Sequence, residues 1–343
     1  MVRGMGQSEH FQNGVRRFAL GLYENAHQLF VQALTDDPED AEARYFLHLC
    51  RRCLAPKPIN RPTLVWQFDP KGAWEADWLR NLFGDAIGSE VIDNTWTRIA
   101  DPMIVVDNRL VTEKALYYRD AFARGARIIL VHLSDEAFRD DRGLYRYCDA
   151  VIRNYHTPLI QDRRVLTIPL GCKAGFVRAG AAPKPAAARA HLWSFAGDFK
   201  KLTRAAMRTA MEDVGPGRCH AIEGFGTPDS LATADYRALL DESVIVPCPS
   251  GWSNLETFRV YEALEAGCIP IVEKRPGFDY FTELLGPHPI PTIFSWDDAP
   301  ALIRSWQAPG TMERVRSDCH AWWEAAKPRI ATTVQDTIKK VLS

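Results

Sequence analysis

The sequence lacks both a charge excess and the long apolar runs of a membrane protein. Its 343 residues carry 42 Lys and Arg against 43 Asp and Glu, so the charge gives no basis for a polyanionic partner. No stretch reaches the roughly 18 apolar residues of a membrane span, and the first residues lack the apolar core of a signal peptide. We therefore expect no nucleic-acid partner, no transmembrane segment, and a cytoplasmic protein that is free or peripheral to the inner face of the membrane.

Two metal-binding patterns are missing as well. The eight cysteines are scattered through apolar runs, and Cys50 with Cys53 has no second Cys or His pair at zinc-ligand spacing. No Asp-x-Asp follows a strand in a polar loop, the arrangement that holds a diphosphate through Mg²⁺ or Mn²⁺. The adjacent Asp pairs at 140–141 and 297–298 suit turns or helix starts. The sequence therefore predicts no metal site and no bound cofactor.

Residues 10–56 carry a helical pattern of alternating small and large side chains. The pattern includes, in order, Ala19, Gly21, Tyr23, Ala26, Phe30, Ala33 and Leu34. It looks like one tetratricopeptide repeat, which is a helical hairpin. Because stacked repeats bury each other, a single copy needs another surface. We expect this segment to cap the neighbouring lobe or to contact a protein partner.

Short β-rich runs alternate with helical stretches in two series. The first has predicted strands at 63–68, 103–106, 127–133, 150–153 and 165–168, with helices at 74–83 and 113–124. The second has predicted strands at 192–195, 219–222, 244–246 and 269–272, with helices at 201–212, 235–241 and 255–266. Strands that alternate with helices indicate a parallel sheet covered on both faces. The fold class is therefore α/β, with two doubly wound lobes.

The composition between the two series places the domain boundaries. We predict a first lobe over 60–178 and a second over 191–310, joined by an Ala- and Pro-rich linker at 179–190 that has little to bury. Residues 311–343 have the pattern of an amphipathic helical tail. By analogy with other two-lobed enzymes, we expect this tail to cross back to the first lobe.

The segment 243–272 reads as one strand–loop–helix–strand unit. Val244 to Val246 form a buried strand, which Pro247, Pro249 and Gly251 stop and turn into a tight loop. The loop follows the carboxyl end of the strand, where open α/β sheets bind their ligands. The sequence therefore predicts a ligand site here.

The start of the helix in this unit indicates the charge of that ligand. Ser253 followed three residues later by Glu256 matches a capping box, so the helix should begin near Asn254. Its first backbone amides would then face the loop. A helix N-terminus in such a place binds anions, so we take Ser253 and Asn254 as candidate phosphate-binding residues.

Arg259 and Glu262 share a face of this helix that its apolar stripe does not use. On a helix between buried strands, such a face suits a cleft. Arg259 could reach a diphosphate with its fork of donors, and Glu262 could accept hydrogen bonds from ribose hydroxyls. The alternative is an ion pair three residues apart on a solvated surface, which stabilises a helix by only a few tenths of a kcal/mol.

These residues resemble the donor-binding signature of exostosin-type glycosyltransferases. The likeness is carried by 257–259 (Thr-Phe-Arg), 262–264 (Glu-Ala-Leu) and 266–270 (Ala-Gly-Cys-Ile-Pro). It implies a GT-B fold, with two facing Rossmann-like lobes, the nucleotide sugar in the second and the acceptor mostly on the first. It also implies that Arg259 contacts the diphosphate and Glu262 the nucleotide ribose.

One position departs from the wider GT-B pattern, which has two glutamates separated by seven residues. Asn254 stands eight residues before Glu262, where the first glutamate would be. In that pattern the first carboxylate usually belongs to retaining enzymes. Its absence favours inversion.

A second motif opens the second lobe, at residues 192–204. A strand that ends in Ala-Gly before a basic helix start also resembles the exostosin-like pattern. There the glycine lets the backbone approach the phosphates, and Lys or Arg neutralises them. Gly197, Lys201 and Arg204 are the candidates. The alternative is a set of basic residues on a solvated helix.

An inverting transfer needs a general base from the first lobe. Four polar residues follow apolar strands of that lobe: Asp107, His132, Asp135 and His156. Each has the alternative of being a loop residue that the backbone satisfies. Because they directly follow the most apolar strands, Asp107 and His132 are our candidates for catalysis.

The predicted activity is transfer of a sugar from a nucleotide sugar to a saccharide or glycoconjugate acceptor. The resemblance makes UDP the expected nucleotide, and the basic residues and helix dipole the expected support for the leaving group without metal. Two other hypotheses fit the same fold: a nucleotide-sugar epimerase or hydrolase, and a non-catalytic nucleotide-binding assembly protein.

Overall fold

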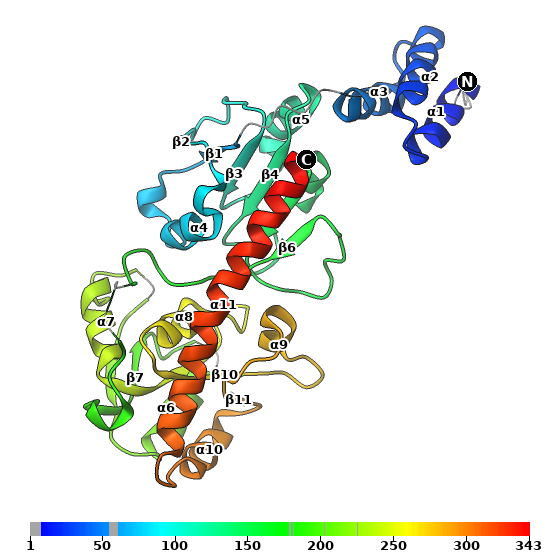
Figure 1. Ribbon diagram of the computed structural model, residues 1–343. Coiled ribbons are helices and arrows are strands. Elements are labelled where there is room, and N and C mark those ends of the chain that lie inside the picture. The colour runs from blue at the N-terminus through cyan, green and yellow to red at the C-terminus, as the bar shows by residue number, and fades with distance from the viewer. Residues whose placement is uncertain (1–7, 55–60, 178–179, 181, 202, 225) are drawn as a thin grey trace.

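Two parallel sheets form the framework of the molecule (Figure 1). The computed structural model describes residues 8–54, 61–177, 180, 182–201, 203–224 and 226–343. The predicted boundaries at 56, 60, 178 and 179 lie outside the described residues. The predicted α/β class, with two lobes built on parallel sheets, is confirmed.

The first lobe has a six-stranded parallel sheet in the order β2-β1-β3-β4-β5-β6. Its strands are β1 (Thr63–Trp66), β2 (Ser89–Ile92), β3 (Met103–Asp107), β4 (Ile128–His132), β5 (Ala150–Arg153) and β6 (Val165–Thr167). Its α-helices are α4 (Ala76–Phe83) and α5 (Ala115–Ala123), with short 3₁₀ turns η1 (Pro70–Gly72), η2 (Gly84–Ala86), η3 (Thr112–Lys114) and η4 (Arg142–Tyr147). Every residue of β3, β4 and β5 is buried, as expected for strands covered on both faces.

The second lobe has a five-stranded parallel sheet in the order β11-β10-β9-β7-β8. Its strands are β7 (His191–Gly197), β8 (Arg218–Ala221), β9 (Ser243–Cys248), β10 (Ile269–Glu273) and β11 (Thr292–Ile293). Its helices are α6 (Arg204–Glu212), α7 (Thr233–Asp241), α8 (Phe258–Glu265), α9 (Tyr280–Leu285) and α10 (Ala299–Ser305), with 3₁₀ turns η5 (Ala186–Ala188) and η6 (Trp296–Asp298). The pattern-based prediction missed β2, β11, α9 and α10, which are short or lie at a sheet edge.

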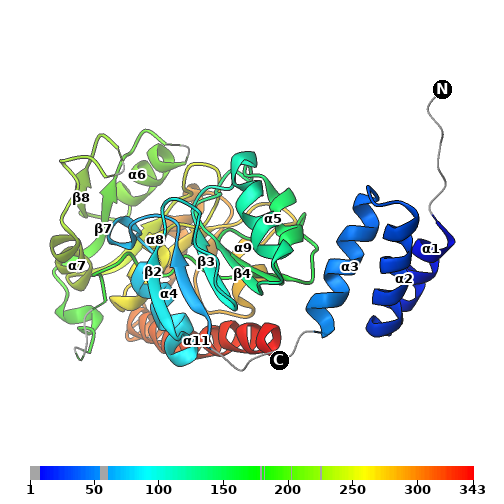
Figure 2. The same cartoon turned by 90° about the horizontal axis from the view of Figure 1, so that it is seen from above.

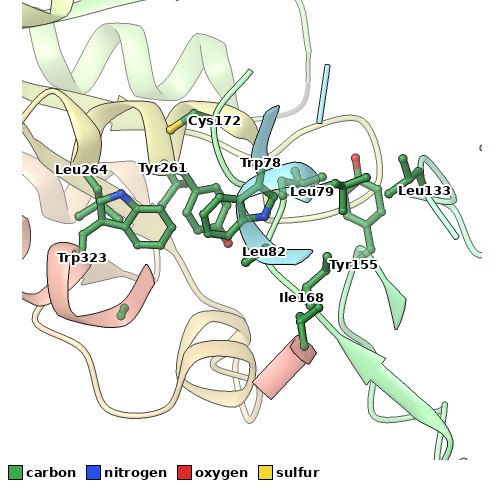
Figure 3. Packing of buried hydrophobic residues seen from close by; sticks show 14 of the residues in the cluster. Trp78, Leu79, Leu82, Leu133, Tyr155, Ile168, Cys172, Tyr261, Leu264 and Trp323 are labelled. Atoms are coloured by element: carbon green, nitrogen blue, oxygen red, sulfur yellow. The ribbon is translucent and has the colours of Figure 1, made fainter. Parts of the chain in front are cut away.

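The C-terminal helix α11 (Thr311–Leu342) packs on both lobes (Figure 1). Trp323 stacks on Trp78 of the first lobe, with ring centroids 5.7 Å apart, and lies 5.3 Å from Tyr261 of the second (Figure 3). Further along, the Gln335 amide donates to the carbonyl of Leu82. This helix therefore ties the lobes together. No helix among the described residues is both long and apolar enough to cross a bilayer.

The N-terminal segment is a three-helix unit, so the predicted single hairpin was wrong. It contains α1 (Glu9–Ala19), α2 (Tyr23–Asp36) and α3 (Ala41–Leu54). What read as one long helical pattern is broken at Gly21, whose φ of 75° suits glycine and ends the first helix. The unit has its own small core, which includes Phe11, Phe30 and Leu47.

The three-helix unit stands to one side of the lobes and meets the first lobe through α3 (Figures 1 and 2). Tyr45 stacks on Phe122 of α5, with 5.7 Å between ring centroids. The His48 ring bonds to the Phe122 carbonyl, and Arg52 forms an ion pair with Asp149. The unit thus caps this end of the first lobe, one of its two expected roles.

The predicted linker at 179–190 is partly embedded in the second lobe. Arg189 is buried, and its guanidinium donates to the carbonyls of Leu240, Ser243 and Ala266. Ala186 donates its backbone N–H to the Glu313 carboxylate of α11. The Ala- and Pro-rich composition did not reveal these contacts, because one arginine makes most of them.

Candidate active site

A cavity of about 320 Å³ lies between the two lobes. From the first lobe it is lined by Trp74, Glu136, Tyr155, Leu170 and Lys173. From the second it is lined by residues that follow β7, β8 and β9, and by one face of α8. This is the carboxyl edge of the second sheet, where doubly wound folds bind ligands.

The loop between β9 and α8 is longer than the sequence indicated. Helix α8 begins at Phe258, with Thr257 as its N-cap, so the predicted start near Asn254 and the capping box were wrong. Glu256 is fully buried and accepts hydrogen bonds from the backbone N–H of Leu170 and the hydroxyls of Tyr261 and Tyr280. Its carboxylate is used to join the lobes, so it cannot reach back to a helix start.

Arg204 and Arg259 both line the cavity, and both lie near the ring of Phe195. Their guanidinium carbons lie 6.0 and 4.5 Å from the centroid of Phe195. Both bond to backbone carbonyls rather than to carboxylates: Arg204 donates to the carbonyls of Asp198 and Ser250, and Arg259 to that of Ala196. The pair therefore keeps its positive charge available to a ligand.

The electrostatics of Arg204 reflect this crowding. Burial and, to a smaller extent, the charge of Arg259 together lower the pKa of Arg204 to about 10. Two like charges in a half-enclosed cavity cost free energy, which an anion between them would recover. The arrangement is suited to a diphosphate.

Gly197 makes the approach of Arg259 possible. A Cβ at this position would lie 3.0 Å from Nη2 of Arg259 and equally close to the Phe195 ring. The glycine therefore leaves room for the guanidinium at the end of β7. Lys201 also lines the cavity, with its Nζ 5.7 Å from the ring of Trp252.

Glu262 lies on the cavity face of α8, one turn beyond Arg259. The side chain is buried, and this desolvation raises its pKa to about 7, against the opposing effect of Arg259. A buried carboxyl that titrates near neutrality fits a ligand-binding role. As a carboxylate it could accept two hydrogen bonds from a diol.

Several polar atoms around the cavity have no partner within the described residues. They are Oγ1 of Thr257, Oγ of Ser230, and Nε of both Arg204 and Arg259. All four residues line the cavity. Buried polar groups are normally hydrogen-bonded, so these atoms mark positions where a polar ligand would supply the partner.

The backbone N–H groups of Ser253 and Asn254 contact the first lobe. Their N–H groups donate to Oε1 of Glu136, over 2.7 and 3.1 Å. Neither residue lines the cavity, whereas Glu136 does. The amides that we expected to hold a phosphate therefore hold a carboxylate of the opposite lobe.

The structure does not bring Asp107 or His132 to the cavity. Asp107 is fully buried and forms an ion pair with Lys114 at 2.5 Å. The two ring nitrogens of His132 are bound by the Tyr145 hydroxyl and the Asp140 carboxylate, at 2.7 and 2.9 Å. Both residues hold the carboxyl edge of the first sheet together, so neither is in place to act as the base.

Sequence reasoning missed the first-lobe wall of the cavity. Glu136, Trp74 and Tyr155 lie in loops with no motif, and Lys173 follows the last strand of its sheet. One signal was available: Glu136 lies four residues after the end of β4, beyond the same strand end as the predicted base His132. No three or more His, Cys, Asp or Glu among the described residues are grouped to hold a metal ion.

A known family model matches the second lobe and the C-terminal helix. Residues 188–342 match the family model described as the RXYLT1 C-terminal domain. The second lobe resembles an exostosin-like xylosyltransferase domain. The RXYLT1 match contains Gly197, Lys201, Arg204, Arg259 and Glu262, and it extends through α11. The resemblance drawn from residues 243–272 is confirmed for the second lobe, because these residues lie within this match.

Two solved structures are similar to this chain at low sequence identity. A mutant of Thermobaculum terrenum O-GlcNAc transferase is 11% identical, with a TM-score of 0.47, over 96% of this chain and 84% of that one. An α1,3-fucosyltransferase is also 11% identical, with a TM-score of 0.48, over 81% and 93%. No curated protein matches the sequence. The fold assignment rests on the two parallel sheets and the RXYLT1 match.

Proposed function

We propose that this protein transfers a sugar from a UDP-linked donor to a saccharide or glycoconjugate acceptor, with inversion and without a metal ion. The observation that carries the proposal is the pair of Arg204 and Arg259. The two guanidinium groups face one cavity between the lobes, bond only to carbonyls within the described residues, and keep both Nε atoms unpartnered. A diphosphate has the charge and the oxygens that this pair needs.

The donor is oriented along helix α8. Arg259 contacts the diphosphate, and Glu262, one turn later, accepts hydrogen bonds from the ribose hydroxyls. Arg204 and Lys201 approach the diphosphate from α6 and the segment before it, and Thr257 offers its hydroxyl at the start of α8. The nucleobase of the donor then lies toward the strand β8 and the loop after it, where His220 and Ser230 line the cavity.

The basic residues stabilise the charge that develops in the reaction. As the acceptor oxygen attacks the anomeric carbon, the bond from that carbon to the diphosphate oxygen breaks on the opposite face, and its electron pair stays on the diphosphate. Arg204, Arg259 and Lys201 balance the resulting negative charge. Since they are fixed before the reaction, little reorganisation is needed.

Calorimetry with UDP-, GDP-, CMP- and dTDP-linked sugars tests the donor. We expect one nucleotide to bind selectively and UDP to be that nucleotide. Incubation of the bound donor without an acceptor, followed by chromatography, separates the enzyme classes: free sugar would indicate a hydrolase, and a changed sugar an epimerase. Selective binding with no turnover on any saccharide would favour the assembly protein, and no nucleotide binding at all would refute the proposal.

A further inference from the structure

Two exposed tryptophans from opposite lobes line the same cavity. Trp252 lies in the loop between β9 and α8 and is 68% exposed, and Trp74 precedes α4 and is 40% exposed. A single exposed aromatic ring is common on a protein surface, but exposed rings that gather at one cavity mark a ligand-binding surface. The two rings lie at the solvent side of the cavity that the proposed donor occupies.

A ring contact holds Trp74, and hydrogen bonds hold the loop that carries Trp252. Trp74 meets Phe258 edge to face, with 6.1 Å between centroids. The loop of Trp252 is closed by a hydrogen bond from Gly251 N–H to the carbonyl of Asn254, at 2.8 Å. The N–H of Ser253, the residue after Trp252, donates to Glu136. The Trp74 ring and the backbone of the Trp252 loop are therefore ordered before a ligand arrives, which lowers the entropy cost of binding. Nζ of Lys173 lies 6.0 Å from the Trp74 ring centroid, and Nζ of Lys201 lies 5.7 Å from that of Trp252.

Glu136 brings a carboxylate to this part of the cavity. Its Oε1 accepts the amides of Ser253 and Asn254, the two residues that follow Trp252. These bonds leave Oε2 as the oxygen that can receive a proton from a ligand. Glu136 comes from the first lobe, opposite the proposed donor, and an inverting enzyme's base must lie within reach of the acceptor hydroxyl that attacks on the face opposite the leaving diphosphate.

We propose that Trp74, Trp252 and Glu136 form the acceptor subsite, and that the acceptor is a saccharide. This inference rests on the proposed function and assigns the acceptor site, for which that proposal names no residues. A sugar ring presents a face of C–H groups, whose weak positive charge suits the negative face of an indole. Hydroxyl groups around the ring reach the polar atoms beside it. Trp74 and Trp252 hold the ring, and Glu136 receives the reacting hydroxyl.

The chemical step follows from this arrangement. Oε2 of Glu136 takes the proton of the acceptor hydroxyl while that oxygen forms its bond to the anomeric carbon of the donor. The bond from this carbon to the diphosphate breaks, and its electron pair leaves with the diphosphate toward Arg204 and Arg259. The proton on Glu136 then passes to solvent as the product leaves, which restores the carboxylate.

Binding can be measured separately from activity. The protein is first saturated with UDP, and methyl glycosides of glucose, galactose, xylose and N-acetylglucosamine are then examined by saturation-transfer NMR. We expect transfer to the ring C–H protons of at least one glycoside. Trp252→Ala and Trp74→Ala should each weaken its affinity about tenfold, as expected for one aromatic contact, while UDP affinity stays unchanged and Trp252→Phe restores part of the loss.

A matched control and a chemical variant complete the test. Phe294→Ala removes a ring that is 60% exposed and lies 4.5 Å from Lys274, but is not part of the cavity lining; it should change nothing. Glu136→Gln should keep glycoside affinity within about twofold and lower kcat by about 10²-fold or more, the usual effect of losing a general base.

The outcomes separate this inference from the proposed function. If UDP binds but no glycoside binds, or if both tryptophan variants bind the glycoside as the wild type does, the acceptor subsite is refuted and the donor site stands. Loss of UDP affinity in Trp252→Ala would mean that this ring stacks on the nucleotide, which also refutes it. If UDP itself fails to bind, the proposed function fails first.

Discussion

Arg204 and Arg259 share the ring of Phe195, although they come from different helices and are 55 residues apart in sequence. Burial, and to a smaller extent the charge of Arg259, disfavours the charged form of Arg204 in the free protein. Each bonds to carbonyls, which fixes its position without neutralising it. The cavity is therefore prepared for an anion at a cost to the stability of the free protein.

The first prediction concerns this arginine pair. Arg259→Ala and Arg204→Ala should each weaken UDP binding by about 10- to 100-fold, the range for hydrogen bonds to charged groups. Titration calorimetry measures the affinity directly. Arg208→Ala is the matched control. Arg208 lies on α6, as Arg204 does, but it pairs with Glu212 and lies over the ring of Phe199, and it does not line the cavity. Equal UDP affinity in all three variants would remove the diphosphate assignment.

The second prediction is a pH dependence of donor binding. Burial raises the pKa of Glu262 to about 7 in the free protein, so the carboxylate that should accept ribose hydroxyls is lost as the pH falls below that value. Because the diphosphate of a UDP-sugar does not titrate near neutrality, UDP-glucose is a suitable probe. Its affinity should fall by up to about tenfold per pH unit below the pKa. In Glu262→Gln the profile should become flat; an unchanged slope would assign the titration to another group.

The third prediction uses Glu75, a buried carboxyl behind the first-lobe wall of the cavity. Desolvation raises its pKa from 4.5 to about 7. The folded protein then binds a proton that the unfolded chain has released, so stability falls as the pH rises between these two values. Glu75→Gln should therefore increase the free energy of unfolding by about 3 kcal/mol at about pH 8 and by almost nothing below about pH 4.

Urea denaturation across this pH range measures the effect. Glutamine keeps an oxygen for the Asn154 amide, which donates to Oε1 of Glu75, so packing is nearly unchanged. Glu113→Gln, at an exposed position of the same lobe, serves as the control and should show no such pH-dependent gain. A gain for Glu75→Gln that is equal at both ends of the range would contradict the expected titration.

The sequence was informative where local patterns determine the structure. Strands β3 and β4 are covered on both faces, so they appear as continuous apolar runs. Strand β2 is an edge strand with mostly exposed side chains, and it carries no such signal. Glu256 fitted a capping box by spacing alone, but packing against Tyr261 and Tyr280 determines its actual partners.

The residues that the two lobes contribute to the site also differ in how well the sequence predicts them. Arg259 and Glu262 lie on one helix, three residues apart, and their common face follows from helical geometry and the exostosin resemblance. Glu136 meets Ser253 across 117 positions of the sequence, and no local motif encodes that contact. Asp107 and His132 were predicted as candidates because each follows an apolar strand. In the structure, Asp107 forms an ion pair with Lys114, and His132 forms a hydrogen bond with Tyr145.

The last prediction concerns the contact between Glu136 and the loop of the second lobe. A Cβ on Gly251 would lie 2.7 Å from Oε1 of Glu136, so Gly251→Ala should displace this carboxylate from the amides of Ser253 and Asn254. If Glu136 acts as the base, kcat should fall by at least about tenfold while UDP affinity changes little. Gly72→Ala, where a Cβ meets nothing within 4 Å, is the control.

A double-mutant cycle shows whether the two residues act together. In Glu136→Gln the base is already lost, so adding Gly251→Ala should lower kcat little further, and the coupling between the two changes should be large. Additive losses would mean that Gly251→Ala acts through the shape of the loop and the placement of Trp252 instead. The cycle thus separates the position of the carboxylate from the position of the aromatic ring, which a single substitution in this loop cannot do.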